Sequence, residues 1–250
     1  MRPEFTASLM CMDLLDIKHQ IEVLDGELDG YHIDIMDGHY CKNITLSPDF
    51  MKACARVAKK PMDVHLMTTN PNDWIDACAA AGAAMISPHA ETINTDCFRT
   101  LNRIRAAGCQ VGGTLNPATP LSYCQHYLNR IDVLTLMTVD VGYAGQPFIE
   151  EMLEKIAQAA RLREENGLPC APMSLHMVFT GNPGTGKTTV WHYKIMIDGS
   201  CNQKTFRRRY EAGADVFVMG SSGLFSLDAD LRAACDTMKR LFAQETGVKL

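Results

Sequence analysis

The feature that most constrains the fold of this chain is a repeated alternation of short apolar runs with longer amphipathic segments. The short runs have the β-branched composition of strands, whereas the longer segments carry apolar residues three and four positions apart, as helices do. Repeated strand–helix units imply parallel strands joined by right-handed crossovers. We expect strands at residues 5–10, 31–36, 62–67, 84–88, 110–115, 133–139, 193–197 and 216–219.

The segments between these strands supply the helices, which we expect at residues 14–24, 48–59, 71–81, 96–107, 121–128, 149–165, 203–212 and 228–245. About eight strand–helix units in 250 residues predict an α/β fold, a closed (β/α)8 TIM barrel that forms a single domain over residues 1–250. An open doubly wound sheet is the alternative. Both folds bind ligands at the carboxyl ends of their strands, so the residues that follow the strands are interpreted together.

Composition argues against several classes of protein. The formal net charge of −5 gives no general attraction to nucleic acid or to anionic membranes. No apolar run reaches the length of a membrane span, and the first residues lack the apolar core of a secretory signal. The ten cysteines are scattered without a Cys-x-x-Cys pair, which argues against a zinc knuckle or a disulfide framework. We expect a cytoplasmic protein without nucleic-acid or membrane partners, and we also expect a homo-oligomer.

Imidazole and carboxylate side chains recur near the ends of the expected strands. The alternation in residues 31–36 places His32 and Asp34 on one face of their strand, and two further strands carry His65 and Asp198. A single His-x-Asp pair is more often a structural hydrogen-bonded pair, and Asp198-Gly199 alone is a turn signal. Together the four side chains form a set that could hold one divalent metal ion, with zinc, cobalt, manganese and iron all compatible.

Glycine and serine gather at the ends of three later strands, where free backbone N–H groups and hydroxyls could cradle a phosphate group. A single Gly-Ser pair at a strand end is usually only a turn, so the signal is the recurrence on several strands. The candidate substrate-binding residues of these loops are Gly142, Tyr143, Ala144, Gly145, Gly199, Ser200, Gly220, Ser221 and Ser222.

Six stretches make the sequence resemble the ribulose-phosphate 3-epimerase family. They are SLMCMD at 8–13, HIDIMDGH at 32–39, DVHLM at 63–67, MTVD at 137–140, AGQPF at 144–148 and DGSCN at 198–202. The resemblance runs from about residue 5 to 168 and resumes at about 193. It implies a TIM barrel acting on a phosphorylated ketose, with His32, Asp34, His65 and Asp198 binding the metal. It also implies that Ser8 and His65 contact the substrate.

The same resemblance implies a mechanism and a substrate. Asp34 and Asp198 would act as acid and base at C3, one removing the proton from one face of the sugar and the other returning a proton to the opposite face. Asp140, the run at 144–147 and the Ser-Cys-Asn after Gly199 resemble the branch that converts D-allulose 6-phosphate to D-fructose 6-phosphate. Conversion of ribulose 5-phosphate to xylulose 5-phosphate is the alternative. Val141 stands where the family usually has proline.

Residues 170–192 form an expected insertion between the sixth helix and the seventh strand. They contain Gly181, Gly186, Lys187 and Thr188 in a complete P-loop pattern, which resembles that of an AAA-type ATPase. The four residues after Thr188 leave too short a helix to hold a nucleotide phosphate, so we interpret the segment as an insertion without its own activity. A P-loop nucleotide-binding protein, or a barrel that lost its activity through the insertion, are the alternative functions.

Overall fold

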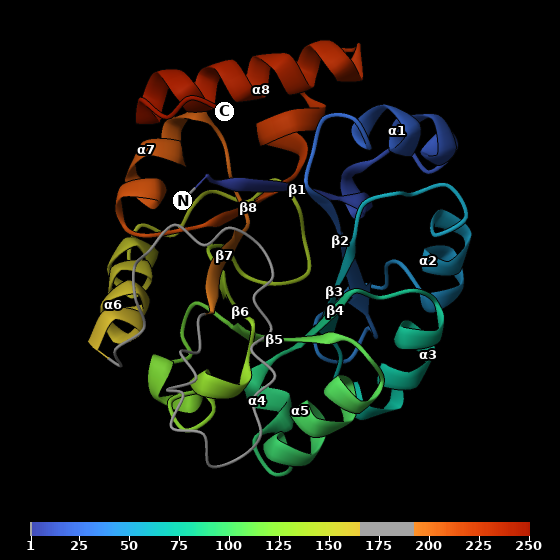
Figure 1. Ribbon diagram of the computed structural model, residues 1–250, viewed down its shortest axis with the longest axis vertical. Coiled ribbons are helices and arrows are strands. Elements are labelled where there is room, and N and C mark those ends of the chain that lie inside the picture. Colours follow the sequence, from blue (N-terminus) through green and yellow to red (C-terminus); the bar gives the residue numbers. More distant parts are fainter. Residues whose placement is uncertain (1, 166–192) are drawn as a thin grey trace, which may run out of the picture.

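The computed structural model describes residues 2–165 and 193–250. Within these residues, parallel strands close into a barrel in which each strand pairs with the next and β8 pairs with β1 (Figure 1). The strands are β1 (Glu4–Ser8), β2 (Gly30–Met36), β3 (Met62–Met67), β4 (Met85–Pro88), β5 (Gln110–Leu115), β6 (Val133–Met137), β7 (Lys194–Asp198) and β8 (Val216–Met219). The (β/α)8 TIM barrel is confirmed, and the alternative of an open doubly wound sheet is wrong.

Helices surround the ring of strands (Figure 1). They are α1 (Ile17–Leu24), α2 (Pro48–Cys54), α3 (Ile75–Ala80), α4 (Ala90–Ile93), α5 (Cys97–Ala106), α6 (Met152–Glu165), α7 (Gln203–Glu211) and α8 (Leu231–Thr246). The long α8 covers the β8–β1 side, where Phe242 packs edge-on against Phe5 and Phe217 with ring centroids 5.0 and 5.1 Å apart. Burial of such aromatic side chains holds the helices on the barrel.

The expected helix at 121–128 is wrong. Two 3₁₀ turns, Leu121–Tyr123 and Leu128–Arg130, take its place. Backbone N–H groups in this segment bond to the carbonyl three residues back, which is the pattern of a 3₁₀ helix. The buried side chains of Leu121, Cys124 and Tyr127 recur with the same period of three. The short α4, which begins directly after His89, was not predicted from the sequence.

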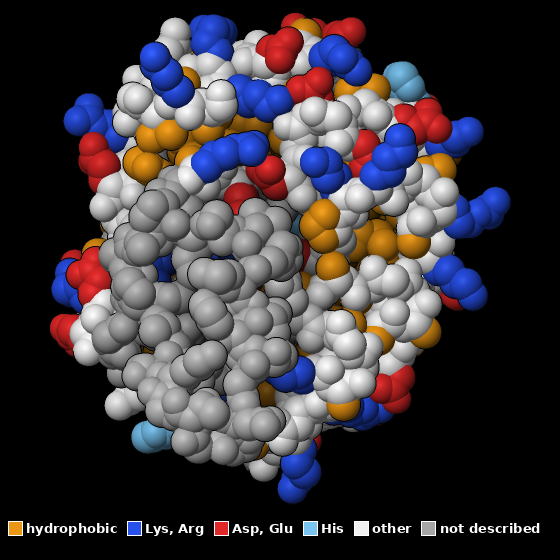
Figure 2. Space-filling model, viewed as in Figure 1, with side chains coloured by type: hydrophobic (Ala, Val, Ile, Leu, Met, Phe, Trp, Pro, Cys, Tyr) orange, Lys and Arg blue, Asp and Glu red, His pale blue; other side chains and the backbone are white. Residues whose placement is uncertain are grey.

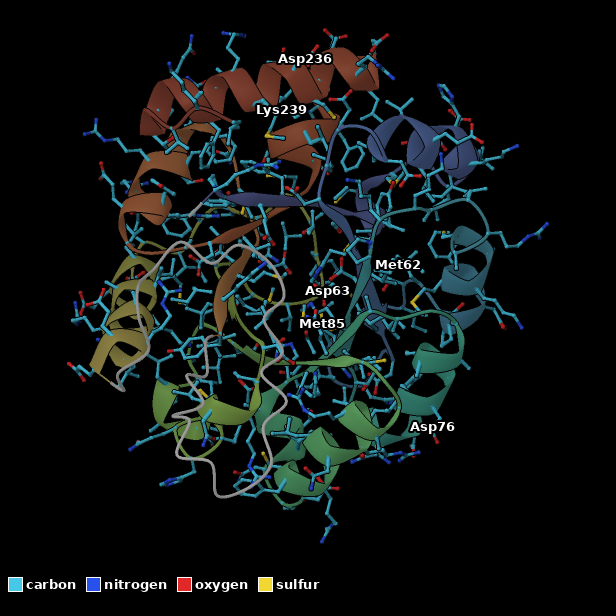
Figure 3. All side chains as sticks on the ribbon, in the orientation of Figure 1. Met62, Asp63, Asp76, Met85, Asp236 and Lys239 are labelled. Atoms are coloured by element: carbon cyan, nitrogen blue, oxygen red, sulfur yellow. The ribbon has the colours of Figure 1, made fainter. Side chains whose placement is uncertain are left out.

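The interior of the barrel changes from apolar to polar along its axis. Met85, Val133, Met196, Val216 and Val218 pack together inside the barrel, and three of them, Met85, Val133 and Val216, are the first residues of their strands. Asp63 and Met85 lie within the ring of strands in Figure 3, and Asp63 pairs in register with His32. One step further along the axis, Asp34 pairs with His65, and Met137 pairs with Asp198. The apolar layer therefore forms a floor below a polar level that opens at the carboxyl ends of the strands.

Figure 2 shows that basic and acidic side chains are both present around one face of the molecule.

Within residues 2–165 and 193–250, no helix is long and apolar enough to cross a bilayer. The P-loop residues Gly181, Gly186, Lys187 and Thr188 lie outside the described residues, and so does the whole expected insertion at 170–192.

Candidate metal centre and active site

Four of the side chains singled out from the sequence meet inside the barrel. One ligand atom from each of His32, Asp34, His65 and Asp198 lies within 4.8 Å of the corresponding atoms of the other three. The residues come from β2, β3 and β7, where the alternation of each strand directs them inward. Both imidazoles are fully buried, and the side chain of Asp198 keeps 15% of its surface exposed toward the pocket.

The donor atoms converge in a way that fits a divalent cation. His32 Nε2 lies 3.4 Å from Asp34 Oδ1 and 3.7 Å from Asp198 Oδ2, and His65 Nδ1 lies 3.2 and 3.7 Å from the same two oxygens. His32 Nε2 is buried and has no hydrogen-bond partner among the described residues. A buried nitrogen lone pair without a partner is costly, and a metal ion bound between two imidazoles and two carboxylates would satisfy it.

His32 is held in place by Asp63, a carboxylate that was not predicted from the sequence to belong to the site. His32 Nδ1 lies 2.7 Å from Asp63 Oδ2, and Ser87 Oγ donates to the other oxygen of Asp63 at 3.3 Å. With its proton on Nδ1, His32 donates to Asp63 and presents the Nε2 lone pair to the cluster. A sequence signal existed, because Asp63 stands two residues before His65 and so faces inward on the same strand.

A second chain of contacts runs outward from His65. His65 Nε2 lies 2.8 Å from His89 Nε2, and His89 Nδ1 lies 3.3 Å from Glu91 Oε2 without the alignment of a hydrogen bond. Glu91 Oε1 accepts hydrogen bonds from Asn116 N and Thr119 Oγ1. With a proton on its Nε2, His65 donates to His89 Nε2, and His89 then carries its own proton on Nδ1. This arrangement leaves the lone pair of His65 Nδ1 free to face the cluster. Neither His89 nor Glu91 was predicted from the sequence.

The pKa values of the two carboxyl groups in the cluster are shifted in opposite directions. Burial opposes ionisation of both, but the neighbouring His32 and His65 hold the pKa of Asp34 well below its usual range. Burial and the nearby Asp34 instead raise the pKa of Asp198. Despite its burial, His32 has its pKa raised by Asp34 and Asp63. Burial lowers the pKa of His89 to about 4, so that this ring is neutral at pH 7. A pair of carboxyl groups with diverging pKa values is typical of acid–base sites.

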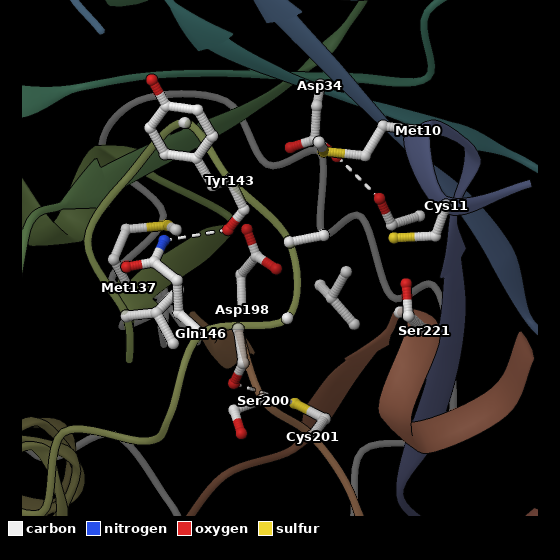
Figure 4. A pocket seen from close by; sticks show the side chains of 18 of the residues that line it. Met10, Cys11, Asp34, Met137, Tyr143, Gln146, Asp198, Ser200, Cys201 and Ser221 are labelled. Atoms are coloured by element: carbon white, nitrogen blue, oxygen red, sulfur yellow. Dashed lines mark hydrogen bonds between the residues drawn. The ribbon is translucent and has the colours of Figure 1, made fainter. Parts of the chain in front are cut away.

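A pocket of about 590 Å³, including its open mouth, lies above the cluster (Figure 4). Asp34 and Asp198 line it together with the candidate substrate-binding residues Ser8, Gly142, Tyr143, Ala144, Gly145, Gly199, Ser200, Gly220, Ser221 and Ser222. His32 and His65 are buried behind this lining. Ser8 Oγ donates to Asp34 Oδ2 at 2.8 Å, which ties β1 to the cluster.

The glycine–serine loops after β7 and β8 form one wall of the pocket, which we call the cradle and define as Gly199, Ser200, Gly220, Ser221 and Ser222. Ser200 adopts a φ of 51°, which is uncommon for a residue with a side chain and typical of functional loops. Asn202 Nδ2 donates to Ser200 O and to Ser222 Oγ, both at 3.2 Å, so it joins the two loops. The cradle offers hydroxyl groups and backbone N–H groups to a ligand.

The loop after β6 closes the opposite side of the pocket. Tyr143 Oη donates to Lys42 O at 2.9 Å, and Asn43 Nδ2 donates to Gly142 O at 2.7 Å. Gln146 Nε2 donates to the carbonyl oxygen of Asp140 and to that of Tyr143, the second of which is drawn in Figure 4. These contacts fix the β6 loop against the loop after β2.

Comparison with known proteins agrees with this geometry. The model of the ribulose-phosphate 3 epimerase family matches residues 4–175. The ribulose-phosphate 3-epimerase of Bacillus subtilis is 35% identical over 216 residues, which cover 86% of this chain and 89% of that protein. The chain belongs to the ribulose-phosphate 3-epimerase family. It is therefore a carbohydrate-phosphate epimerase, an isomerase.

Other members of the ribulose-phosphate 3-epimerase family match at a similar level. The ribulose-phosphate 3-epimerase of Escherichia coli K12 is 32% identical over 224 residues, covering 89% of this chain and 88% of that protein. Among solved structures, 3-hexulose-6-phosphate synthase from Salmonella typhimurium superposes with a TM-score of 0.62 at 13% identity, covering 97% of this chain and 99% of that one. At that identity the likeness shows the barrel fold alone.

Proposed function

We propose that this protein catalyses the metal-dependent 3-epimerisation of a ketose phosphate, with D-allulose 6-phosphate preferred over ribulose 5-phosphate. The observation that carries the proposal is the convergence of two carboxylates and two imidazoles at the base of a pocket whose other wall is the cradle. The position of Asp140, Ala144 and Ser200 in the pocket lining supports the allulose branch, because these residues carry the resemblance to it.

The two carboxylates have complementary roles in this proposal. Asp34, ionised by its imidazole neighbours, accepts the proton from C3 of the substrate, and Ser8 holds its other oxygen in place. Asp198, with its raised pKa, carries a proton that it returns to C3 from the opposite face. A divalent ion held by His32, Asp34, His65 and Asp198 would supply positive charge that stabilises the enediolate oxygens. The cradle would bind the phosphate group and fix the distance from C3 to the acid–base pair.

The test is an epimerase assay on both sugar phosphates with added zinc, cobalt, manganese or iron. We expect turnover of both sugars and a higher kcat/KM for D-allulose 6-phosphate. Asp34→Asn and Asp198→Asn should each lower kcat by about a thousandfold or more, because each removes one of two required proton carriers. Asp76→Asn, on exposed α3, is the matched control and should leave kcat unchanged. Near-normal turnover in either active-site variant would contradict the two-base mechanism, and a preference for ribulose 5-phosphate would contradict the allulose assignment.

A further inference from the structure

The charges around the pocket are the wrong sign for a phosphorylated substrate. Its lining, among the described residues, includes the carboxylates of Asp34, Asp140 and Asp198 but no lysine or arginine. A phosphate monoester carries between one and two negative charges near pH 7, so it would enter a pocket lined by acids. Neutral N–H groups and hydroxyls of the cradle can donate hydrogen bonds, but they carry no net charge to offset this repulsion.

A buried arginine lies directly behind the cradle. Arg209 on α7 has no exposed surface, and its Nη1 donates to the carbonyl oxygen of Gly199 at 2.8 Å and contacts Cys201 Sγ at 3.0 Å. Both Gly199 and Cys201 line the pocket. The guanidinium also stacks on Phe148 from the β6 loop, with Cζ 4.2 Å from the ring centroid. Helical side chains lean toward the helix amino terminus, which brings this one back to the loop where α7 begins.

This arginine forms no ion pair within the described residues, and the charge of Asp198 acts on it only through space. Its Nε and Nη2 have no hydrogen-bond partner within the part of the chain that the structure describes, and no ion pair involves it there. Burial raises the pKa of the Cys201 thiol to about 11, so the sulfur is uncharged at pH 7. Burial also lowers the pKa of Arg209, which nevertheless stays protonated because a guanidinium does not titrate in the neutral range. An unpaired buried cation is strongly unfavourable unless a ligand brings the opposite charge.

The neighbouring arginines show that burial is specific to this position. Arg207 and Arg208 precede it on the same helix, but their side chains are 66% and 44% exposed and pair with Glu211 and Glu150. Only the third arginine of the run faces the barrel. Its contact with Gly199 also polarises the peptide group that contains the Ser200 N–H, which strengthens that N–H as a donor.

We infer that Arg209 is the positive charge of the phosphate site, acting from behind the cradle through the Gly199–Ser200 peptide without touching the ligand. It is a positioning and electrostatic residue. The inference rests on the proposed function, because it assigns the cradle to the phosphate group of the substrate. It predicts that loss of this charge weakens binding of the anion and leaves the acid–base chemistry at Asp34 and Asp198 intact.

The test uses inorganic phosphate as the probe, with its dissociation constant measured by calorimetry on the full chain. Arg209→Met removes the charge and keeps the length of the side chain, Arg209→Gln keeps a donor for Gly199, and Arg209→Lys keeps the charge. We expect the Met and Gln variants to bind phosphate about tenfold more weakly, and the Lys variant within about threefold of wild type. KM for the sugar phosphate should rise by the same factor while kcat changes by less than about twofold.

Arg207→Met is the matched control, since it removes an exposed charge from the same helix and should leave phosphate affinity unchanged. Thermal unfolding gives a further readout, because removal of an unpaired buried charge should leave the melting temperature of the ligand-free Met variant unchanged or higher. Wild-type affinity for phosphate in a folded Gln or Met variant would overturn the inference, as would a wild-type protein that binds no phosphate. Arginine-dependent phosphate binding in a protein that epimerises neither sugar would instead overturn the proposed function and leave this inference standing.

Discussion

The candidate metal cluster lies at the base of the pocket that the cradle lines, but different parts of the fold build the two. The cluster residues lie on β2, β3 and β7 and are almost fully buried, and each imidazole is in contact with a further polar side chain, Asp63 or His89. The cradle lies on loops, includes left-handed backbone at Gly199 and Ser200, and receives its charge from an arginine behind it. Strands fix the reacting groups in position, whereas loops provide backbone donors that a strand would use in its ladder.

The comparison predicts two kinds of response to substitution. Changes in the cluster should abolish catalysis, because two of its members would transfer the protons at C3 and all four would hold the same cation. Changes in the cradle should alter KM in a graded way, because they shift a binding group relative to an intact catalytic pair.

Removal of the metal should have the largest effect. Dialysis against a chelator should lower kcat by about a thousandfold or more and restore it on addition of a divalent ion. The melting temperature should fall as well, because a cation at about a hundred times its dissociation constant stabilises the folded state by about 3 kcal/mol. Metal content measured alongside activity checks the result. Full activity in a protein shown to be free of metal would mean that the cluster serves only as an acid–base site.

Substitution of Glu91 should weaken the metal site from a distance. Glu91→Gln removes the charge that orients His89, and through it His65, and loss of such an outer partner commonly costs about 10- to 100-fold in metal affinity. Competition with a chromogenic chelator measures this affinity without relying on turnover. Glu154→Gln, on the exposed surface of α6, is the control. Unchanged affinity in Glu91→Gln would show that β3 alone orients His65.

Glycine substitutions in the two pocket loops should produce a smaller effect. Gly199 has a φ of 99°, and an added Cβ would lie 2.5 Å from Val139 Cγ2. Gly145 has a φ of 80° with no atom within 4 Å of such a Cβ, so Gly145→Ala adds backbone strain alone. We expect Gly199→Ala to raise KM about tenfold and Gly145→Ala about two- to threefold, both with kcat little changed. A large loss of kcat in Gly199→Ala would place the loop in the catalytic step.

The smallest effect should appear in acid stability at the edge of the cluster. Burial opposes ionisation of Asp37, but hydrogen bonds from the backbone N–H groups of Thr69, Tyr40 and His39 lower its pKa to about 2. The unfolded chain takes up this proton near pH 3.8, so the contribution is complete above about pH 4 and is lost as the pH falls toward 2. Asp37→Asn should therefore show a shallower fall in unfolding free energy over that window. Asp236→Asn, exposed on α8 (Figure 3), should keep the wild-type slope.

Local pattern determined much of this protein. Period-two alternation located the strands that carry His32, Asp34 and His65, and the repeat of strand–helix units predicted the barrel. Because all parallel strands of a barrel end at one face, residues far apart in the sequence could be assigned to one site before their contacts were known. The helix expected at 121–128 failed for a local reason, since a buried period of three and a period of 3.6 differ little over so short a segment.

Only the tertiary structure decided which further groups act on the site. Whether the strands close into a barrel or form an open sheet depends on the pairing of β8 with β1, which no local pattern encodes. Asp63 and His89 contact the cluster because adjacent strands set their register across the barrel. In sequence, Arg209 is the last of three adjacent arginines and is typical of a solvated helix face. Packing of α7 against the barrel buries the side chain of only this one of the three arginines, because burial depends on the neighbours that a helix meets and not on its own residues.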